Sequence, residues 1–348
     1  MMADWRVDMM PNMKRLLLFS FFIAAAVARP VAQDYKAYQN YDFVPGDKIL
    51  FEDDFRTDTD GEFPAHWKLK KGQAVINKMG DDPIFALTDG NYVEVEPRMK
   101  TASYLSDPFT VEFDFFVKPG AFEQVIIYFR TEDGDKGIHV GHDVSSENFE
   151  NDLSATAPGE ADDFLSKWHH AALAFKNGQI KVYIDQNRVL VMPDAKIKPT
   201  SLELAGIGDK DNPIIIKNVR IAAGGGMTLI DKLTKDGKIV THGILFDVNK
   251  STVKPESMGT VGQIVKLLKD NPGLKLEIGG HTDADGDAAK NLTLSQSRAD
   301  AVKKLLVDQG VDAARLTTKG YGATKPVDVN TTLEGKANNR RVEFTKAG

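Results

Sequence analysis

The spacing of hydrophobic and polar residues divides the chain into two parts. Between residues 48 and 223, short runs alternate apolar and polar positions, as at 111–115 and 180–185, while 125–129 is apolar throughout. Alternation with a period of two is typical of strands with one buried face, and a continuous apolar run is typical of strands buried on both faces. Turn signals such as Asn177-Gly178 recur, and helical periodicity is nearly absent. Residues 48–223 are therefore predicted to form an all-β sandwich.

After residue 241 the hydrophobic pattern becomes that of an α/β domain. Pro255 opens one predicted helix, and a second runs through Arg298 to about residue 309, before Gly310. Strands are predicted at 244–246, 274–278, 316–318 and 342–344. The order is strand, helix, strand, helix, strand, short helix and strand, which is a βαβαββ domain. Asp247 and Asp283 are then expected at the carboxyl ends of strands, where open α/β sheets commonly bind ligands.

Glycine and charge patterns set the expected boundaries. The triplet Gly224-Gly225-Gly226 begins a predicted linker with a short helix, 224–240, between the sandwich and a second domain at 241–348. At the other end of the chain, two basic residues precede an apolar run at 16–27, followed by a small-residue cleavage pattern. Residues 1–32 are therefore predicted to be a signal peptide with an upstream extension, and the polar, tyrosine-rich 33–47 a flexible lead-in.

Composition narrows the chemistry. The 348-residue chain contains no cysteine, which excludes disulfides, thiol catalysis and cysteine-ligated metals. A net charge of −6 argues against a nucleic-acid binder. The charge is uneven, because residues 241–348 hold 16 Lys/Arg against 13 Asp/Glu. The second domain is therefore the better candidate for an anionic partner.

Asp283 and Arg298 form the most informative pair in the sequence. Asp283 follows a predicted strand, and Arg298 lies in an early turn of the next helix on the same face as Asn291. A helix dipole disfavours a cation there by a few tenths to about 1 kcal/mol, so an anion should compensate it. Two interpretations remain open from the residues: an internal Asp283–Arg298 ion pair, or a site that grips both charges of a small zwitterion.

Motifs in the last hundred residues of the chain are Phe246-Asp247, Gly280-His281-Thr282-Asp283, Asn291, Leu294-Ser295, Arg298-Ala299, Gly320-Tyr321-Gly322, Pro326 and Asn339-Arg340-Arg341-Val342-Glu343. In these residues, and over about the last hundred positions, the second domain resembles the OmpA-like C-terminal domain family. The resemblance implies non-covalent binding of peptidoglycan in the periplasm of a Gram-negative envelope. It also implies that Asp283 and Arg298 hold the free amino-acid end of diaminopimelate in the stem peptide.

The same motif positions make three further residues candidate rim contacts: Asn249, Asn291 and Arg340. Of the adjacent arginines, we expect one to pair inside the domain, with Asp247 as the candidate partner, and the other to face solvent or ligand. An ammonium and a carboxylate on one carbon suit an Asp and an Arg, since the Arg fork can donate two parallel hydrogen bonds. No cofactor is expected.

The acidic run 283–287 invites a test for calcium. Its D-x-D-G-D pattern is similar to the start of a calcium loop, but the twelfth position, which should be Glu, is Leu294. We therefore predict a solvated loop and no metal.

The first domain contains the motifs Leu50-Phe51-Glu52-Asp53-Asp54-Phe55, Pro64-Ala65-His66-Trp67, Lys167-Trp168-His169-His170-Ala171-Ala172-Leu173 and Val182-Tyr183-Ile184-Asp185. In these motifs it resembles a concanavalin-like, laminin-G-type sandwich. Such sandwiches include sugar binders, protein binders and glycosidases, so an outer-membrane protein and a glycan are both open as partners.

The alternative function is a glycoside hydrolase acting on wall polymer or another glycan. The laminarinase-type pattern E-x-D-x-x-E is approached by Glu112, Asp114 and Val117, which leaves one of the carboxylates missing. We therefore expect no catalytic residues. The sequence predicts a peptidoglycan-associated periplasmic protein, and leaves attachment to the outer membrane open.

Overall fold

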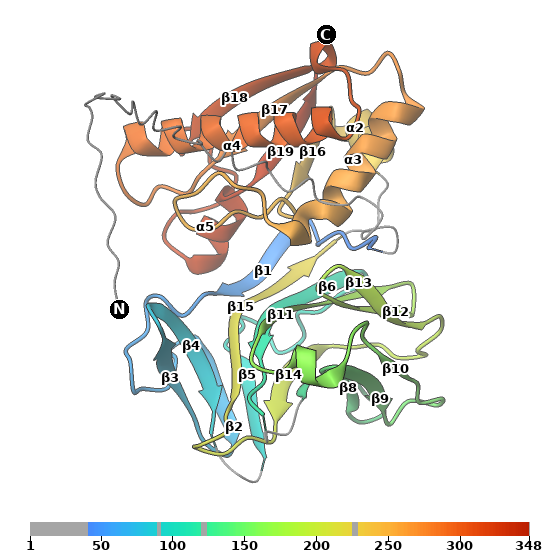
Figure 1. Cartoon of the computed structure of the whole chain (residues 1–348), viewed down its shortest axis with the longest axis vertical. Coiled ribbons are helices and arrows are strands. Elements are labelled where there is room, and N and C mark those ends of the chain that lie inside the picture. Colours follow the sequence, from blue (N-terminus) through green and yellow to red (C-terminus); the bar gives the residue numbers. More distant parts are fainter. Residues whose placement is uncertain (1–40, 89–91, 120–123, 225–228, 348) are drawn as a thin grey trace, which may run out of the picture. The chain divides into compact units, whose positions relative to one another are not determined.

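Two antiparallel β-sheets around one hydrophobic core form the first part of the chain. The computed structural model describes residues 41–347 except 89–91, 120–123 and 225–228, so the predicted signal peptide lies outside the described residues. In the eight-stranded sheet the order is β13-β12-β11-β6-β15-β4-β3, with β1 paired to β15. In the seven-stranded sheet it is β10-β9-β8-β7-β14-β5-β2 (Figure 1).

The strands of the first sheet are β1 (Lys48–Asp53), β3 (Ala74–Met79), β4 (Asp82–Leu87), β6 (Phe109–Phe116), β11 (Trp168–Lys176), β12 (Gln179–Ile184), β13 (Asn187–Met192) and β15 (Ile214–Ala223). Those of the second are β2 (Trp67–Lys71), β5 (Val93–Pro97), β7 (Val125–Arg130), β8 (Lys136–Val140), β9 (Asp143–Glu147), β10 (Ser154–Thr156) and β14 (Ser201–Gly206). A short helix, α1 (Ala161–Phe164), precedes β11. The prediction of a largely β first part is confirmed; its concanavalin-like class stays a prediction.

Strand β6 is buried on both faces, although its sequence alternates. Phe109, Val111 and Phe113 enter the sandwich core. On the opposite face, Glu112 and Asp114 are also buried, at 3% and 9% exposure. Buried carboxylates need partners, so this face of the sandwich must be covered by other polar groups rather than by water.

The second part is a four-stranded sheet with helices packed on it. The sheet order is β16-β19-β17-β18, from β16 (Lys238–Thr241), β17 (Leu276–His281), β18 (Leu316–Gly322) and β19 (Val342–Lys346). The helices are α2 (Leu229–Asp236), α3 (Met258–Asp270), α4 (Ala288–Asp308) and α5 (Leu333–Asn339), with short 3₁₀ turns η2 (Pro255–Ser257) and η3 (Ala313–Arg315). Figure 1 shows α4 running across these strands.

Apolar periodicity places the helices correctly. The predicted stripe of α3, which includes Val261, Ile264 and Leu268, is buried in the same core as Ile278 of β17 and Phe344 of β19. Strands β17 and β18 are parallel, as the strand–helix–strand unit predicts, whereas β19 lies antiparallel between β16 and β17.

The first predicted strand of this domain is wrong. Residues 244–246 form only an isolated bridge between Phe246 and Val253, and the strand that enters the sheet is β16, which begins at Lys238. Ile239 of β16 and Leu233 of α2 are buried in the second core. The end of the predicted linker therefore belongs to this domain. The sequence pattern did not indicate this strand, because a short edge strand buries only every second residue and gives a weak signal.

The described end of the predicted lead-in is packed, unlike the flexible segment that its composition predicts. Tyr41 and Phe43 are 5% and 2% exposed and contact Tyr183 and Ala172 of the sandwich. A Cβ on Gly259 of α3 would lie 2.1 Å from the carbonyl oxygen of Phe43. Only glycine therefore lets the helix approach this segment.

Strand β1 is bound to the second part by side-chain hydrogen bonds. The amide of Asn338 in α5 accepts from the Ile49 N–H at 2.9 Å and donates to the Ile49 carbonyl at 3.2 Å. Ile49, Ala222 and Ala337 form a small buried cluster at the same place. The described residues from Tyr41 onward fall in one compact unit.

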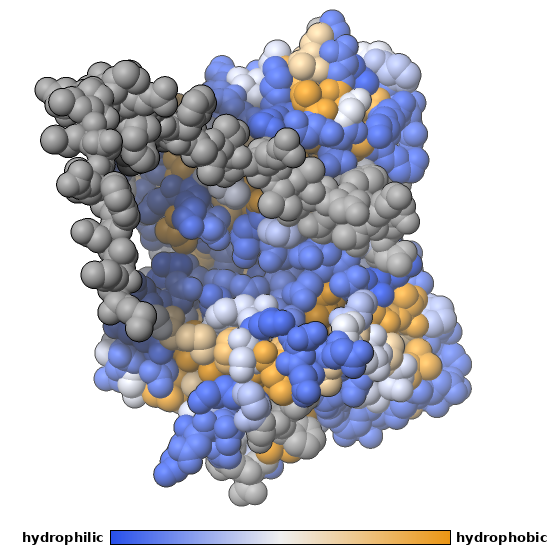
Figure 2. All heavy atoms as spheres, in the orientation of Figure 1, coloured by the Kyte–Doolittle hydropathy of each residue, from blue (hydrophilic) through white to orange (hydrophobic). Residues whose placement is uncertain are grey.

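The length and hydropathy of the helices in the described residues decide whether one could span a membrane. In the described residues no helix is both long and apolar enough to span a bilayer. On the face drawn in Figure 2, hydrophobic residues form small groups separated by hydrophilic ones.

Two glycines of α3 provide a matched test of this packing. Gly259→Ala should lower the free energy of unfolding by about 1–3 kcal/mol, because its Cβ would overlap the Phe43 carbonyl. Gly262→Ala on the same helix has nothing within 4 Å of its Cβ and should raise stability by about 0.5–1 kcal/mol, the ordinary helix preference of alanine. Denaturant unfolding of both variants measures this; equal effects would contradict the close approach.

Candidate functional site

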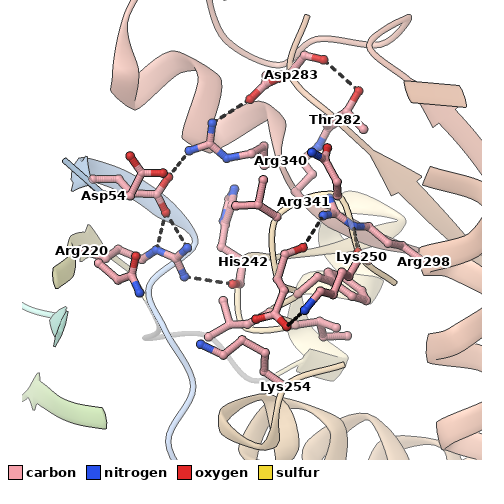
Figure 3. A pocket seen from close by; sticks show the side chains of 18 of the residues that line it. Asp54, Arg220, His242, Lys250, Lys254, Thr282, Asp283, Arg298, Arg340 and Arg341 are labelled. Atoms are coloured by element: carbon pink, nitrogen blue, oxygen red, sulfur yellow. Dashed lines mark hydrogen bonds and ion pairs between the residues drawn. The ribbon is translucent and has the colours of Figure 1, made fainter. Parts of the chain in front are cut away.

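A cleft of about 820 Å³ lies between the β6 face of the sandwich and the strand ends of the second sheet. The sandwich contributes residues of β1, β6, β11 and β15. The other wall is built from the loop 244–254, residues 280–285, the start of α4 and residues 340–342. Charged residues of both signs line it, and Figure 3 shows many of them pointing into it.

Asp283 lines this cleft at the carboxyl end of β17. It follows β17 by two residues, and its side chain is 13% exposed. One carboxylate oxygen accepts from Arg340 Nη1 at 2.7 Å, and the other accepts from the Asp285 N–H at 3.1 Å. Asp287 then caps α4 by accepting from the Lys290 N–H at 2.8 Å. Asp283 therefore lies in a short segment that is held at one end by β17 and at the other by the N-cap of α4.

Arg298 lines the same cleft but does not pair with Asp283. Its Nε donates to the carbonyl of Lys250 at 3.0 Å and its Nη2 to the carbonyl of Asp247 at 3.3 Å. Its guanidinium carbon lies 4.8 Å from the centre of the Phe246 ring. Among the described residues no carboxylate lies within ion-pair distance of it. Burial, followed by the nearby charge of Arg340, lowers the pKa of Arg298.

Arg340 holds the carboxylates of two different elements. It bonds to Asp283 and, through Nη2, to Glu52 of β1. Glu52 also accepts from Arg220 Nε of β15 at 2.9 Å. Burial would raise the pKa of Glu52, but the charges of Arg220 and Arg340 lower it to about 2. Glu52 is thus ionised and carries its negative charge into the cleft.

One of the adjacent arginines pairs inside the domain, as expected, but its partner is not the expected Asp247. Arg341 is buried and pairs with Glu343 at 2.7 Å, while Asp247 pairs with Lys250 at 3.2 Å. Neither of the adjacent arginines therefore takes Asp247. Arg341 is held by Glu343, whereas Arg340 reaches Asp283 and Glu52.

The other two candidate rim residues differ in their freedom. Asn291 donates to the carbonyl of Asp285 at 2.8 Å and so holds the acidic loop. Asn249 is exposed, at a left-handed turn with φ of 57°. Both line the cleft, as does Arg340.

The sandwich wall of the cleft is a buried polar cluster. His170 bonds to Asp114 at 2.7 Å and lies 3.6 Å from Glu112. Burial opposes both shifts, but the mutual bond lowers the pKa of Asp114 to about 2 and the two carboxylates raise that of His170 to about 10. Val117 is fully buried in the core. The third carboxylate position of the glycosidase pattern is thus a core residue on a different face.

Comparison with known proteins finds relatives of the second domain. Residues 245–340 match the OmpA family. The domain is 42% identical over 104 residues to "Probable lipoprotein YiaD" of Escherichia coli, a match that covers 30% of this chain and 48% of the relative. It is 47% identical over 100 residues to "Outer membrane porin F" of Pseudomonas fluorescens, covering 29% of this chain and 31% of the relative. The chain thus spans less than half the length of these relatives.

A solved structure, the peptidoglycan-associated lipoprotein from Burkholderia pseudomallei, is 31% identical and aligns with a TM-score of 0.29, covering 30% of this chain and 88% of that one.

Sequence reasoning missed the residues that the sandwich adds to the OmpA-like domain. Glu52 and Arg220 lie far from Arg340 in the chain, and their local patterns are those of ordinary strands. The carbonyls of Asp247 and Lys250 that hold Arg298 are also invisible in a sequence, because every residue has one.

Metal-type ligands gather at a place that the sequence did not suggest. Asp53, Asp58 and His66 of the sandwich each offer a ligand atom, and these atoms lie within 4.8 Å of one another. In the acidic loop of the OmpA-like domain, by contrast, Asp285 pairs with Lys336 at 2.9 Å and Asp287 caps a helix. The carboxylates of that loop thus have structural uses.

His281 gives the OmpA-like domain a measurable acid sensitivity. The imidazole is 3% exposed and stacks on Tyr321 at 4.9 Å, and neither ring nitrogen has a hydrogen-bond partner among the described residues. Burial, and then the charge of Arg341, lower its pKa to about 4. The unfolded chain therefore binds this proton near pH 6.5, before the folded chain does.

We expect stability to fall as the pH drops from about 6.5 to 4, with His281 contributing up to about 3 kcal/mol. His281→Phe keeps the ring stacking and should remove that share of the pH dependence. Urea unfolding of both proteins at pH 7, 5.5 and 4.5 measures the difference. His242, whose pKa is also lowered to about 4, should act in the same direction, whereas Asp53, whose pKa is raised by burial to about 6, should act in the opposite one. Identical pH profiles for variant and wild type would contradict this role of His281.

Proposed function

We propose that this chain binds peptidoglycan non-covalently and so tethers the β-sandwich to the cell wall. In this proposal the OmpA-like domain takes the free end of diaminopimelate, whose ammonium and carboxylate share one carbon. Asp283 receives the ammonium and Arg298 the carboxylate. Asn249, Asn291 and Arg340 form the rim of the site.

The state of Arg298 is the observation that carries the proposal. It is a half-buried guanidinium with no carboxylate partner among the described residues, and burial and the nearby charge of Arg340 lower its pKa. Its hydrogen bonds to the carbonyls of Lys250 and Asp247 use two of its five N–H groups. The remaining N–H groups suit the bidentate geometry of a carboxylate, and that ligand would supply the missing negative charge.

Asp283 supports the other half of the ligand. One oxygen of its carboxylate accepts from Arg340 and the other from the Asp285 N–H, whereas a carboxylate has about four acceptor positions. An ammonium can therefore bind without displacing Arg340. Two to four charge-assisted bonds of about 1.5–3 kcal/mol each give weak to moderate affinity, which suits a polymer that repeats the same group.

The names of relatives and structural neighbours agree with this proposal. They include a peptidoglycan-associated lipoprotein, a type VI secretion cell-wall anchor and outer-membrane porins. We place this chain by analogy in the periplasm, against peptidoglycan. The sandwich then serves as the tethered domain, with an outer-membrane protein or a glycan as its partner.

Removing the charge of either Asp283 or Arg298 should strongly weaken binding of the protein to peptidoglycan. Asp283→Ala and Arg298→Ala should each weaken sedimentation with insoluble peptidoglycan at least about tenfold, because each deletes a charge-assisted contact. Circular dichroism and thermal unfolding check that the fold is intact. Asp270→Ala and Lys304→Ala, exposed charges on α3 and α4, are matched controls that should sediment like wild type.

Two results would contradict the proposal. One is sedimentation of both site variants at wild-type levels. The other is release of soluble muropeptides from peptidoglycan during the same incubation, which would indicate a hydrolase instead of a binding protein.

A further inference from the structure

Arg340 poses an electrostatic problem for the proposed site. Its guanidinium lies 2.7 Å from the carboxylate of Asp283, the residue that should attract an ammonium. An Asp–Arg pair on its own is neutral, and the arginine would repel a second cation beside it. The OmpA-like domain taken alone therefore has an acid whose charge is already cancelled.

The sandwich supplies the negative charge that is missing. Glu52, from β1, binds Arg340 on the side away from Asp283, and its side chain is only 14% exposed. The carboxylates of Asp283 and Glu52 then share one guanidinium, so the three groups together carry one negative charge. Beyond them Arg220 is shared between Glu52 and Glu112, whose carboxylate lies 3.9 Å from Nη1.

The position of Glu52 is built into the fold. Three residues earlier, Ile49 makes both of its backbone hydrogen bonds to Asn338, two residues before Arg340. On the other side, Arg220 donates to Glu52 at 2.9 Å and to the carbonyl of His242 at 3.3 Å. The carboxylate of Glu52 is thus fixed from both domains, because Arg340 contacts both Glu52 and Asp283. Figure 3 shows Arg340 pointing toward Asp283.

The charges of the cleft now match a zwitterion. At one end the four carboxylates of Asp283, Glu52, Glu112 and Asp114 face the three cations Arg340, Arg220 and His170, which leaves one negative charge. At the other end Arg298 has no carboxylate partner among the described residues. A ligand with an ammonium and a carboxylate on one carbon is complementary to this arrangement. A ligand with two carboxylates and no ammonium gains only from Arg298.

We propose that the β-sandwich is part of the ligand site, with Glu52 as a positioning residue that occupies Arg340 and leaves the charge of Asp283 for the ligand's ammonium. This inference rests on the proposed binding of diaminopimelate. The sandwich then helps to select a ligand end that carries both an ammonium and a carboxylate over one that carries a carboxylate alone, in addition to being the tethered domain.

The test is calorimetric titration of the full chain with meso-diaminopimelate and with pimelate, the same carbon chain without amino groups. Glu52→Gln should weaken diaminopimelate binding about tenfold and leave pimelate binding unchanged or stronger, because only the ammonium depends on the lost charge. Glu52→Asp keeps the charge and should restore affinity to within about threefold of wild type. Glu132→Gln, an exposed glutamate after β7, is the matched control and should bind both ligands like wild type.

Asp283→Asn separates the two proposals. If it binds diaminopimelate like wild type, the proposed function is wrong. If it loses binding while Glu52→Gln does not, the function stands and the role of the sandwich is overturned. Equal weakening of both ligands in Glu52→Gln would also overturn it, since that result indicates a general loss of structure at the cleft.

Discussion

Compensation of buried guanidinium charge is the constraint on which the cleft depends. Removing an arginine from water costs several kcal/mol unless a carboxylate is close, so each arginine in this region needs an anionic neighbour. Arg220 has Glu52, Arg340 has Glu52 and Asp283, and Arg341 has Glu343. Arg298 alone among these four has no carboxylate partner within the described residues, and carbonyl groups and an aromatic ring hold it instead. This is the charge that the carboxylate of the proposed ligand would meet.

The same constraint explains the second face of the sandwich. A sandwich strand that faced solvent could carry carboxylates without partners, but Glu112 and Asp114 are buried. They are balanced by His170 and by Arg220, which also reaches the β16–α3 connection through the carbonyl of His242. Polar pairing, the Asn338–Ile49 hydrogen bonds and the close approach of Gly259 to Phe43 thus bind the two lobes through specific contacts. A tethered domain joined only by a flexible linker would need none of them.

Much of the fold could be predicted because its elements bury regular patterns. The stripe of α3, the alternation of β17 and the run at 125–129 are all local periodicities that burial requires. The prediction of a strand at 244–246 was wrong because Ile244 is buried and apolar without belonging to the sheet. The sheet is completed by β16 instead, and a four-residue strand in which Ile239 is the fully buried apolar residue is too short to show a hydrophobic period. The packing of Tyr41 and Phe43 was missed because aromatic residues in a polar stretch show no period at all.

The sequence by itself determined that Asp283 and Arg298 would share one end of an α/β sheet, because strand ends and helix starts follow from local patterns. Only the tertiary structure decided which charges meet. Asp283 takes Arg340 rather than Arg298, and Glu52 of another domain joins them. Ion pairing acts through space and is indifferent to separation along the chain, so the distances that select one arginine over another exist only after both lobes have packed.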